Sequence, residues 1–90
     1  MPEIYSIVLI HNSLIIYIRR ITMDKKIESI IQRIKNQQYY LKLMLTELEE
    51  NKNSLESDNV FTIEQNYNRM LEDSNQMKKE ILDLYEYIEE

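Results

Sequence analysis

The chain has 90 residues, a formal net charge of −5, no cysteine, no glycine and a single proline. A chain of this length forms at most one small domain, and the absence of cysteine excludes disulfides and thiolate chemistry. The acidic balance disfavours nucleic acid as a partner, because phosphate binding depends on lysine and arginine. Without glycine or further proline to interrupt it, the chain is expected to form long helices.

Residues 1–22 differ from the rest because residues 4–18 are rich in β-branched and aromatic side chains, with the turn-like His11-Asn12-Ser13 in the middle. Strand-forming residues on both sides of a turn favour a short β-hairpin. A membrane anchor is an alternative, although the run is shorter than the roughly twenty residues that cross a bilayer. A third interpretation is a non-native extension, with the native chain starting at Met23. We therefore expect an apolar N-terminal segment, residues 1–22, followed by a helical domain, residues 23–90.

Two helices are predicted in that domain, over residues 24–56 and 63–88, with a short turn between them. Thr22 precedes the first helix and has the side chain of a good N-cap. Thr62 and Gln65, three residues apart, form a capping-box signature at the start of the second helix.

Both predicted helices carry apolar side chains at heptad spacing. In the first helix the heptad positions are Ile27, Ile31, Ile34, Gln38, Leu41, Leu45, Leu48, Lys52 and Leu55. In the second they are Ile63, Tyr67, Met70, Ser74, Met77, Ile81, Leu84 and Ile88. Such spacing gathers the side chains into one stripe of a helix, which must pack against a partner.

The two stripes can be paired layer by layer if the turn centres near Asp58-Asn59. Leu45 then meets Ser74 and Leu41 meets Met77. The sequence therefore predicts an all-α fold, an elongated antiparallel two-helix hairpin or coiled coil, which another helix or a second copy completes to a three-helix or dimeric bundle.

Side chains beside the stripes are the candidate partner-binding residues. They are Lys35, Tyr39, Tyr40, Leu43, Leu71 and Tyr85. Tyrosine brings rigid, amphipathic area to protein interfaces. The alternative for Tyr40 is that it packs with Met44 at the edge of the hairpin. These flanking residues imply a third surface over the hairpin, supplied by another helix, a second copy or a client protein.

Nothing in the sequence points to catalysis, and we expect no enzyme, no cofactor and no metal site. His11, the only histidine, has no other residues of a catalytic motif near it in the sequence, and there is no glycine-rich loop to hold a phosphate. The carboxylates are explained by solvated helix faces. A metal site in a helical bundle would need a Glu-x-x-His arrangement, which the chain lacks.

Several short motifs resemble those of one known family. Gln32-Arg33-Ile34-Lys35, followed by Tyr39-Tyr40, is similar to a Lys-Arg-Leu-x-Lys element and the tyrosines after it. Phe61-Thr62-Ile63 is similar to an aromatic-Asp-hydrophobic helix opening, and Met70-Leu71-Glu72-Asp73-Ser74, with Met77 beyond it, to a hydrophobic-Leu-acidic-acidic-Ser/Thr element. Residues 32–85 thereby resemble the tubulin-binding cofactor A family, whose third helix has no counterpart in this sequence.

The resemblance implies a cytoplasmic folding factor that captures β-tubulin on a helical surface without using ATP. The alternative function is a structural coiled-coil subunit of a larger complex, of a prefoldin-like, tethering or kinetochore-type assembly. A membrane-anchored adaptor that uses residues 4–18 is a further alternative. The expected partner is β-tubulin or another protein, with a homodimer also considered, and neither nucleic acid nor a membrane is favoured.

Overall fold

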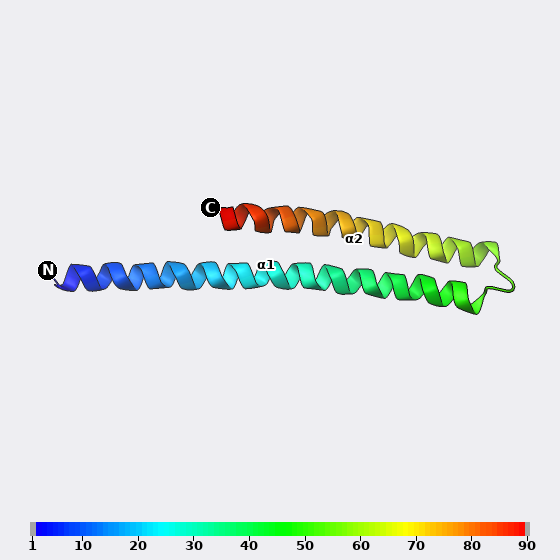
Figure 1. The fold of residues 1–90 in the computed structure, drawn as a ribbon, viewed down its shortest axis with the longest axis horizontal. Coiled ribbons are helices and arrows are strands. Elements are labelled where there is room, and N and C mark those ends of the chain that lie inside the picture. Colours follow the sequence, from blue (N-terminus) through cyan, green and yellow to red (C-terminus); the bar gives the residue numbers. More distant parts are fainter. Residues whose placement is uncertain (1, 90) are drawn as a thin grey trace.

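The protein is a hairpin of two long helices. The computed structural model describes the backbone of residues 2–89 and the side chains of residues 7–89. Helix α1 (Pro2–Glu50) and helix α2 (Ser57–Glu89) run antiparallel along most of the length of α2 (Figure 1). The molecule measures 81 × 19 × 14 Å, and its radius of gyration is 22.3 Å, against about 12 Å for a compact domain of this length. The predicted all-α antiparallel hairpin is confirmed.

The N-terminal segment is helical, so the prediction of a β-hairpin there is wrong. Residues 2–22 form the first turns of α1, and His11-Asn12-Ser13 lies inside the helix. The β preference of branched side chains depends on context, and an existing helix extends by one hydrogen bond for each residue added. In the described part of the chain, neither helix contains an apolar stretch sufficient to cross a bilayer. The division into residues 1–22 and 23–90 stays a prediction, and residues 1 and 90 lie outside the described residues.

The predicted N-caps are not helix ends. Thr22 and Thr62 both lie within helices, and their hydroxyls donate to the carbonyl oxygens of Ile18 and Asp58, at 2.9 and 3.0 Å. Threonine tolerates a helix interior when its hydroxyl bonds back to the preceding turn in this way. Helix α1 ends at Glu50, earlier than expected, and α2 begins six residues before position 63.

Asparagine side chains order the connection between the helices. The side-chain oxygen of Asn59 accepts a hydrogen bond from the backbone N–H of Glu56 at 2.9 Å, the second half of a capping box with Glu56 as the N-cap. The amide nitrogen of Asn59 also donates to the Glu47 carboxylate at 2.6 Å. Asn51 donates to the backbone carbonyl of Glu47 at 2.9 Å. The loop is thereby tied to the last turns of α1.

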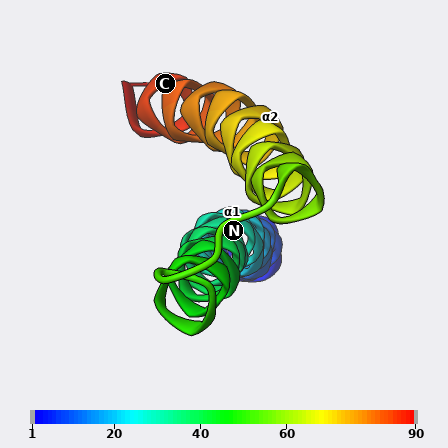
Figure 2. The ribbon, with the colours of Figure 1, turned by 90° about the vertical axis from the view of Figure 1, so that its right-hand side faces the viewer.

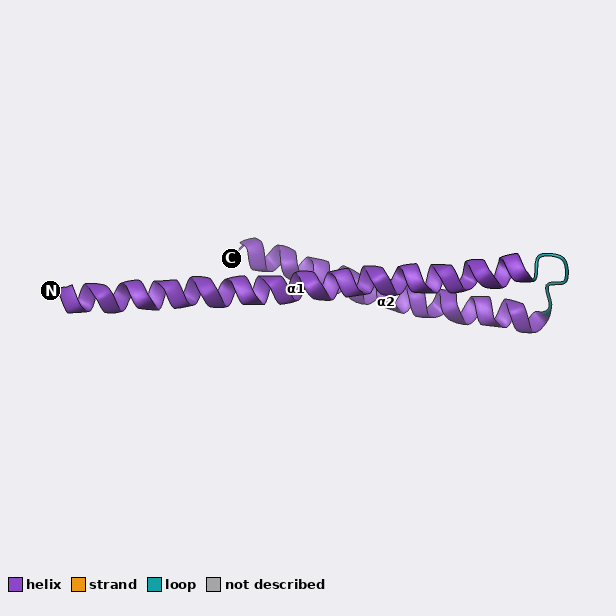
Figure 3. Ribbon diagram, turned by 90° about the horizontal axis from the view of Figure 1, so that it is seen from below, coloured by secondary structure: helices purple, strands orange, loops and turns teal. Residues whose placement is uncertain are grey.

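The helices cross at a shallow angle. Viewed along the pair, α2 moves across α1 from one end to the other (Figure 2). From below, α2 lies on one side of α1 near the loop and on the opposite side near its C-terminus (Figure 3). This arrangement is typical of paired helices whose contacts repeat every heptad.

Helix α1 is longer than its partner and extends past it. Tyr87, near the end of α2, donates its hydroxyl to the carbonyl oxygen of Arg19 at 2.9 Å. Arg19 and Lys26 also lie over the Tyr87 ring, 5.6 and 5.5 Å from its centroid. Residues 7–18 extend beyond this contact (Figure 1), and all of them are exposed.

The described residues contain no hydrophobic core. No hydrophobic side chain among them is buried, and the buried side chains are Asn66 and Asp73, which are 7% and 8% exposed. A two-helix hairpin can bury only one line of contacts, and here much of that line is polar.

Candidate partner-binding face

The interface between the helices alternates polar and apolar side chains. On α1 the less exposed residues at heptad spacing are Lys26, Ile30, Arg33, Gln37, Tyr40, Met44 and Glu47, and Asn51 continues the spacing directly after the helix end. On α2 they are Asn59, Ile63, Asn66, Met70, Asp73, Met77, Glu80, Leu84 and Tyr87. The four-three spacing is the predicted one, but the residues on it differ.

The helices are rotated relative to the prediction. On α1 every interface residue stands one position before its predicted counterpart, so Arg33 and Gln37 replace Ile34 and Gln38. One position corresponds to a rotation of about 100° around the helix. On α2 half of the predicted positions are kept, and the others shift by one residue, as where Glu80 replaces Ile81. The predicted apolar core is therefore wrong.

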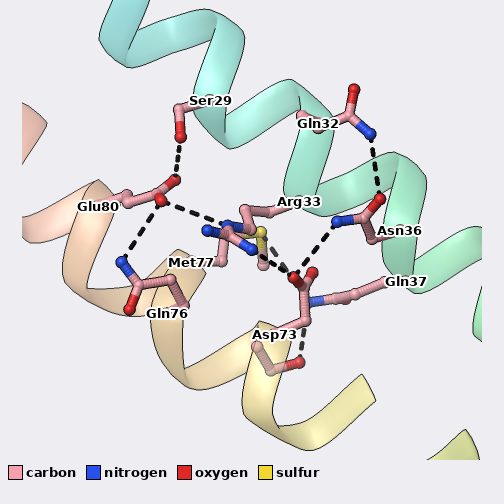
Figure 4. Close-up of polar contacts among 10 residues, drawn as sticks. Ser29, Gln32, Arg33, Asn36, Gln37, Asp73, Gln76, Met77 and Glu80 are labelled. Carbon is pink, nitrogen blue, oxygen red and sulfur yellow. Dashed lines mark hydrogen bonds and ion pairs between the residues drawn. The ribbon is translucent and has the colours of Figure 1, made fainter. Parts of the chain in front are cut away.

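A polar network at the middle of the interface accounts for this rotation (Figure 4). The Arg33 guanidinium donates to Asp73 at 2.9 Å and to Glu80 at 3.3 Å. The Ser29 hydroxyl donates to the other oxygen of Glu80 at 2.8 Å, and the Asn36 amide donates to Asp73 at 3.4 Å. These charge-assisted hydrogen bonds are directional, and their donors and acceptors meet only in the observed rotation of the two helices.

The network continues toward both ends and fixes the register. Gln37 donates to the hydroxyl of Ser74 at 2.8 Å and lies 4.0 Å from the Met77 sulfur, whereas the predicted partners of these two α2 residues were Leu45 and Leu41. Nearer the ends of the pair, Lys26 forms an ion pair with Asp83. The difference arises because the loop spans residues 51–56 instead of centring near Asp58-Asn59.

The charges in the network shift each other's titration. Hydrogen bonds to Asp73 and then Glu80 raise the pKa of Arg33. Desolvation alone would raise the pKa of Glu80, but hydrogen bonds from Ser29, Arg33 and Gln76, with the charge of Arg33, lower it overall. Within the described residues, the Oδ2 atom of Asp73 is buried and accepts no hydrogen bond, so this carboxylate depends on the donors at its other oxygen.

Most of the apolar side chains expected between the helices face outward instead, although Ile63, Met70, Met77 and Leu84 of α2 stay at the interface. Nine large apolar side chains of the predicted stripes are between 40% and 60% exposed, and so is Val60, one heptad before Tyr67: Ile27, Ile31, Ile34, Leu41, Leu45 and Leu48 of α1, and Val60, Tyr67, Ile81 and Ile88 of α2. We call this set the apolar face.

Both stripes lie on the same side of the helix pair. Gln37 neighbours Ile34 and Leu41 on the surface of α1, because residues three and four apart are adjacent on a helix. Its partner Ser74 stands on the heptad line of Tyr67 and Ile81 on α2. The hydrogen bond between Gln37 and Ser74 therefore joins the inner edges of the two stripes. The apolar face is one continuous surface across both helices.

The candidate partner-binding residues on α1 do not all lie on the same side of the helix. Lys35 and Tyr39 are exposed and one turn apart, on neither the interface nor the apolar face. Tyr40 is half-buried and lines a groove with Arg69 and Asp73. Its ring lies edge-on to that of Tyr39, with centroids 5.8 Å apart.

The other three candidate residues, Leu43, Leu71 and Tyr85, do not form one site with Lys35 and Tyr39. Leu43 is half-buried, whereas Leu71 and Tyr85 of α2 are exposed, on the outer side of the Tyr67–Ile81 line. Leu71 and Tyr85 stand two heptads apart, about 20 Å along the helix. The partner-binding roles of all six candidates stay predictions.

Sequence reasoning missed the polar interface itself. The signal was present, since Lys26, Arg33, Tyr40 and Glu47 follow one another at strict seven-residue spacing. It was outweighed by the purely apolar stripe one residue further along. Among residues 7–89, no three His, Asp or Glu side chains gather in a way that could hold a metal ion.

Comparison with known proteins finds no matching family model, no similar curated protein and no similar solved structure. The resemblance of residues 32–85 to the tubulin-binding cofactor A family therefore remains a prediction.

Proposed function

We propose that the chain is a structural coiled-coil subunit that joins a larger protein assembly by docking its apolar face against other helices. The observation that carries this proposal is the outward position of the α1 stripe from Ile27 to Leu48 and of the α2 line through Tyr67 and Ile81. A soluble hairpin that acted alone would bury such stripes between its helices, because burial of apolar area is the main stabilising contribution to folding.

The polar interface supports this function because a network of ion pairs adds little net stability. Removing charges from water costs about as much as their attraction returns, so such networks are better at selecting one geometry than at stabilising it. In this hairpin the geometry selected by Arg33, Asp73 and Glu80 is the one that displays the apolar face. The energy that holds the assembly together would then come from docking of that face.

Site-specific photo-crosslinking in cells tests the proposal. A photoreactive amino acid is placed at Ile34 or Leu45 on the apolar face, and in matched variants at Gln32 or Thr46. The control positions lie on the same helix, are exposed and point away from the apolar face. Crosslinks to polypeptides are expected from Ile34 and Leu45 only. Equal crosslinking from all four positions, or none from any, would contradict docking through this face.

Capture of β-tubulin in the cytoplasm is the second candidate function. It is supported by the exposed pair Lys35 and Tyr39, which lies within the segment that resembles the first helix of the tubulin-binding cofactor A family. A cation beside an aromatic side chain is suited to anchoring a partner, since a few such residues carry most of the energy of an interface. A pull-down with purified tubulin tests this candidate directly.

A further inference from the structure

We infer that a second copy of this chain covers the apolar face, so that two hairpins pack face to face in a two-fold symmetric four-helix bundle. This inference rests on the proposed function, because it names the occupant of the same face. It is carried by the exposed area of the chain, by the shape and period of the face, and by symmetry.

The exposed area of a single chain is larger than a stable monomer of this size shows. The chain exposes 7686 Å², whereas a compact monomer of 11.0 kDa exposes about 5,600 Å². The excess of roughly 2,000 Å² is more than the approximately 800 Å² that each partner contributes to a standard interface. The elongated shape and the exposed residues 7–18 account for part of this excess, and the exposed surface of the hairpin is large enough for an interface with a second copy.

The shape of the apolar face further restricts the kind of partner that can cover it. The α1 stripe runs from Ile27 to Leu48, about 30 Å along the helix, and α2 supplies a second stripe beside it. A partner must therefore present two parallel ridges of that length with the same heptad period, because only equal periods keep helices in contact along a supercoil. A second copy of the chain meets this requirement because it carries the same apolar face.

Symmetry makes the arrangement closed. A two-fold axis through the face brings the same patch of both copies together, so no apolar stripe is left open for further addition. The polar network lies on the inside of each hairpin and is not needed for contact between copies. The half-exposed residues that border the apolar face, Ile30, Met44, Met70 and Met77, would line the centre of the bundle.

The test is the oligomeric state of the full chain, measured by sedimentation equilibrium. We expect a particle of twice the 11.0 kDa monomer mass, with a melting temperature that rises with protein concentration. The double variant Ile34→Glu/Leu45→Glu should weaken the dimer by at least about 100-fold, because it places charges in an apolar interface. The matched variant Gln32→Glu/Thr46→Glu should leave the dimer unchanged.

A monomer at all concentrations would overturn the inference, and so would a dimer that the double variant does not affect. If the wild-type chain is a monomer while its Ile34 and Leu45 positions still crosslink to other polypeptides in cells, the second copy is wrong and the docking function stands. The two failures are therefore distinguishable.

A second measurement applies if the double variant fails to fold. Because the chain has no cysteine, a single cysteine in place of Gln38, at the middle of the α1 stripe, can be joined between copies by a short bismaleimide. We expect covalent dimers from Gln38→Cys at low protein concentration and none from Thr46→Cys. The same yield from both variants would contradict a face-to-face dimer.

Discussion

Arg33 of α1 donates to Asp73 of α2 at 2.9 Å, across the middle of the helix interface. The Asp73 side chain is only 8% exposed, whereas Arg33 keeps 34% of its side chain in contact with solvent. The pair is bridged to Glu80 on the same helix as Asp73. A charged cluster therefore occupies the middle of the interface, where an ordinary hairpin would have a hydrophobic core, and most of the apolar side chains of the heptad stripes lie outside.

Removing one member of this pair should destabilise the protein more than removing both. In Arg33→Leu the buried Asp73 carboxylate loses its counter-ion, and we expect the melting temperature to fall by several degrees. In Arg33→Leu/Asp73→Leu two apolar side chains meet instead, and the melting temperature should return to the wild-type value or exceed it. Thermal melts by circular dichroism, at one protein concentration, separate the two cases. An unchanged melting temperature in Arg33→Leu would show that the pair does not hold the interface.

The lowered pKa of Glu80 predicts that the stability of the folded protein decreases at acidic pH. The pKa of Glu80 in the folded state is below the unfolded value of about 4.3. Between these two pKa values the unfolded state therefore binds more protons than the folded state. The contribution of Glu80 to stability is complete above about pH 4.3 and is lost as the pH falls through the folded pKa. At pH 7, Glu80→Gln should melt roughly 5 °C below the wild type.

This difference should disappear below the folded pKa of Glu80. The control is Glu86→Gln, which changes an exposed carboxylate on the same helix and should match the wild type at both pH values. A Glu80→Gln deficit that persists at low pH would mean that the lost contribution is packing and not charge.

The sequence is sufficient to predict two antiparallel helices, but not how they are rotated. Heptad spacing and the absence of glycine determine the helices, because both are local properties. The rotation depends on which of two adjacent heptad lines faces inward. Ile34 and Leu41 favour one line by hydrophobicity, whereas Arg33 stabilises the other through contacts with residues forty and more positions away. No property of a single helix shows that contact.

The prediction of a β-hairpin in the N-terminal segment is wrong for a related reason. Its β-branched side chains favour strands when a second strand is available to pair with. Here residues 7–18 continue a helix that is already formed, and the candidate turn at His11-Asn12-Ser13 contains no residue that interrupts it. Of the candidate site, the exposure of Lys35 and Tyr39 was predictable from their place outside the stripe, whereas the burial of Asp73 was not.

Two adjacent glutamines offer a matched pair of variants. Gln38 is the polar member of the α1 stripe, and a polar residue in an apolar heptad line specifies pairing at a cost in stability. Gln38→Leu should therefore raise the melting temperature at concentrations where the dimer forms. Gln37→Leu, which loses the hydrogen bond to Ser74, should lower it. Calorimetry on both variants measures the effect, and the opposite order would place Gln38 at the helix interface.

The tubulin candidate leads to a separate prediction. Tyr39→Ala with Lys35→Glu should weaken binding of purified tubulin while leaving helix content and melting temperature nearly unchanged, because both side chains are exposed. A pull-down with thermal melts alongside measures both effects. Intact binding by the double variant would move the client surface elsewhere on the hairpin. An absence of tubulin binding by the wild type would remove this candidate.

Polar side chains pair within the hairpin and leave the apolar face outside. Disulfide trapping can test this pairing, because the chain contains no cysteine. Gln37→Cys/Ser74→Cys replaces two side chains that are hydrogen-bonded at 2.8 Å, whereas Leu45→Cys/Ser74→Cys joins the positions that meet if the apolar stripes pair. In dilute solution under mild oxidation, we expect a disulfide within one chain in the first variant and none in the second. Rapid crosslinking of Leu45→Cys/Ser74→Cys, with none in Gln37→Cys/Ser74→Cys, would contradict the account.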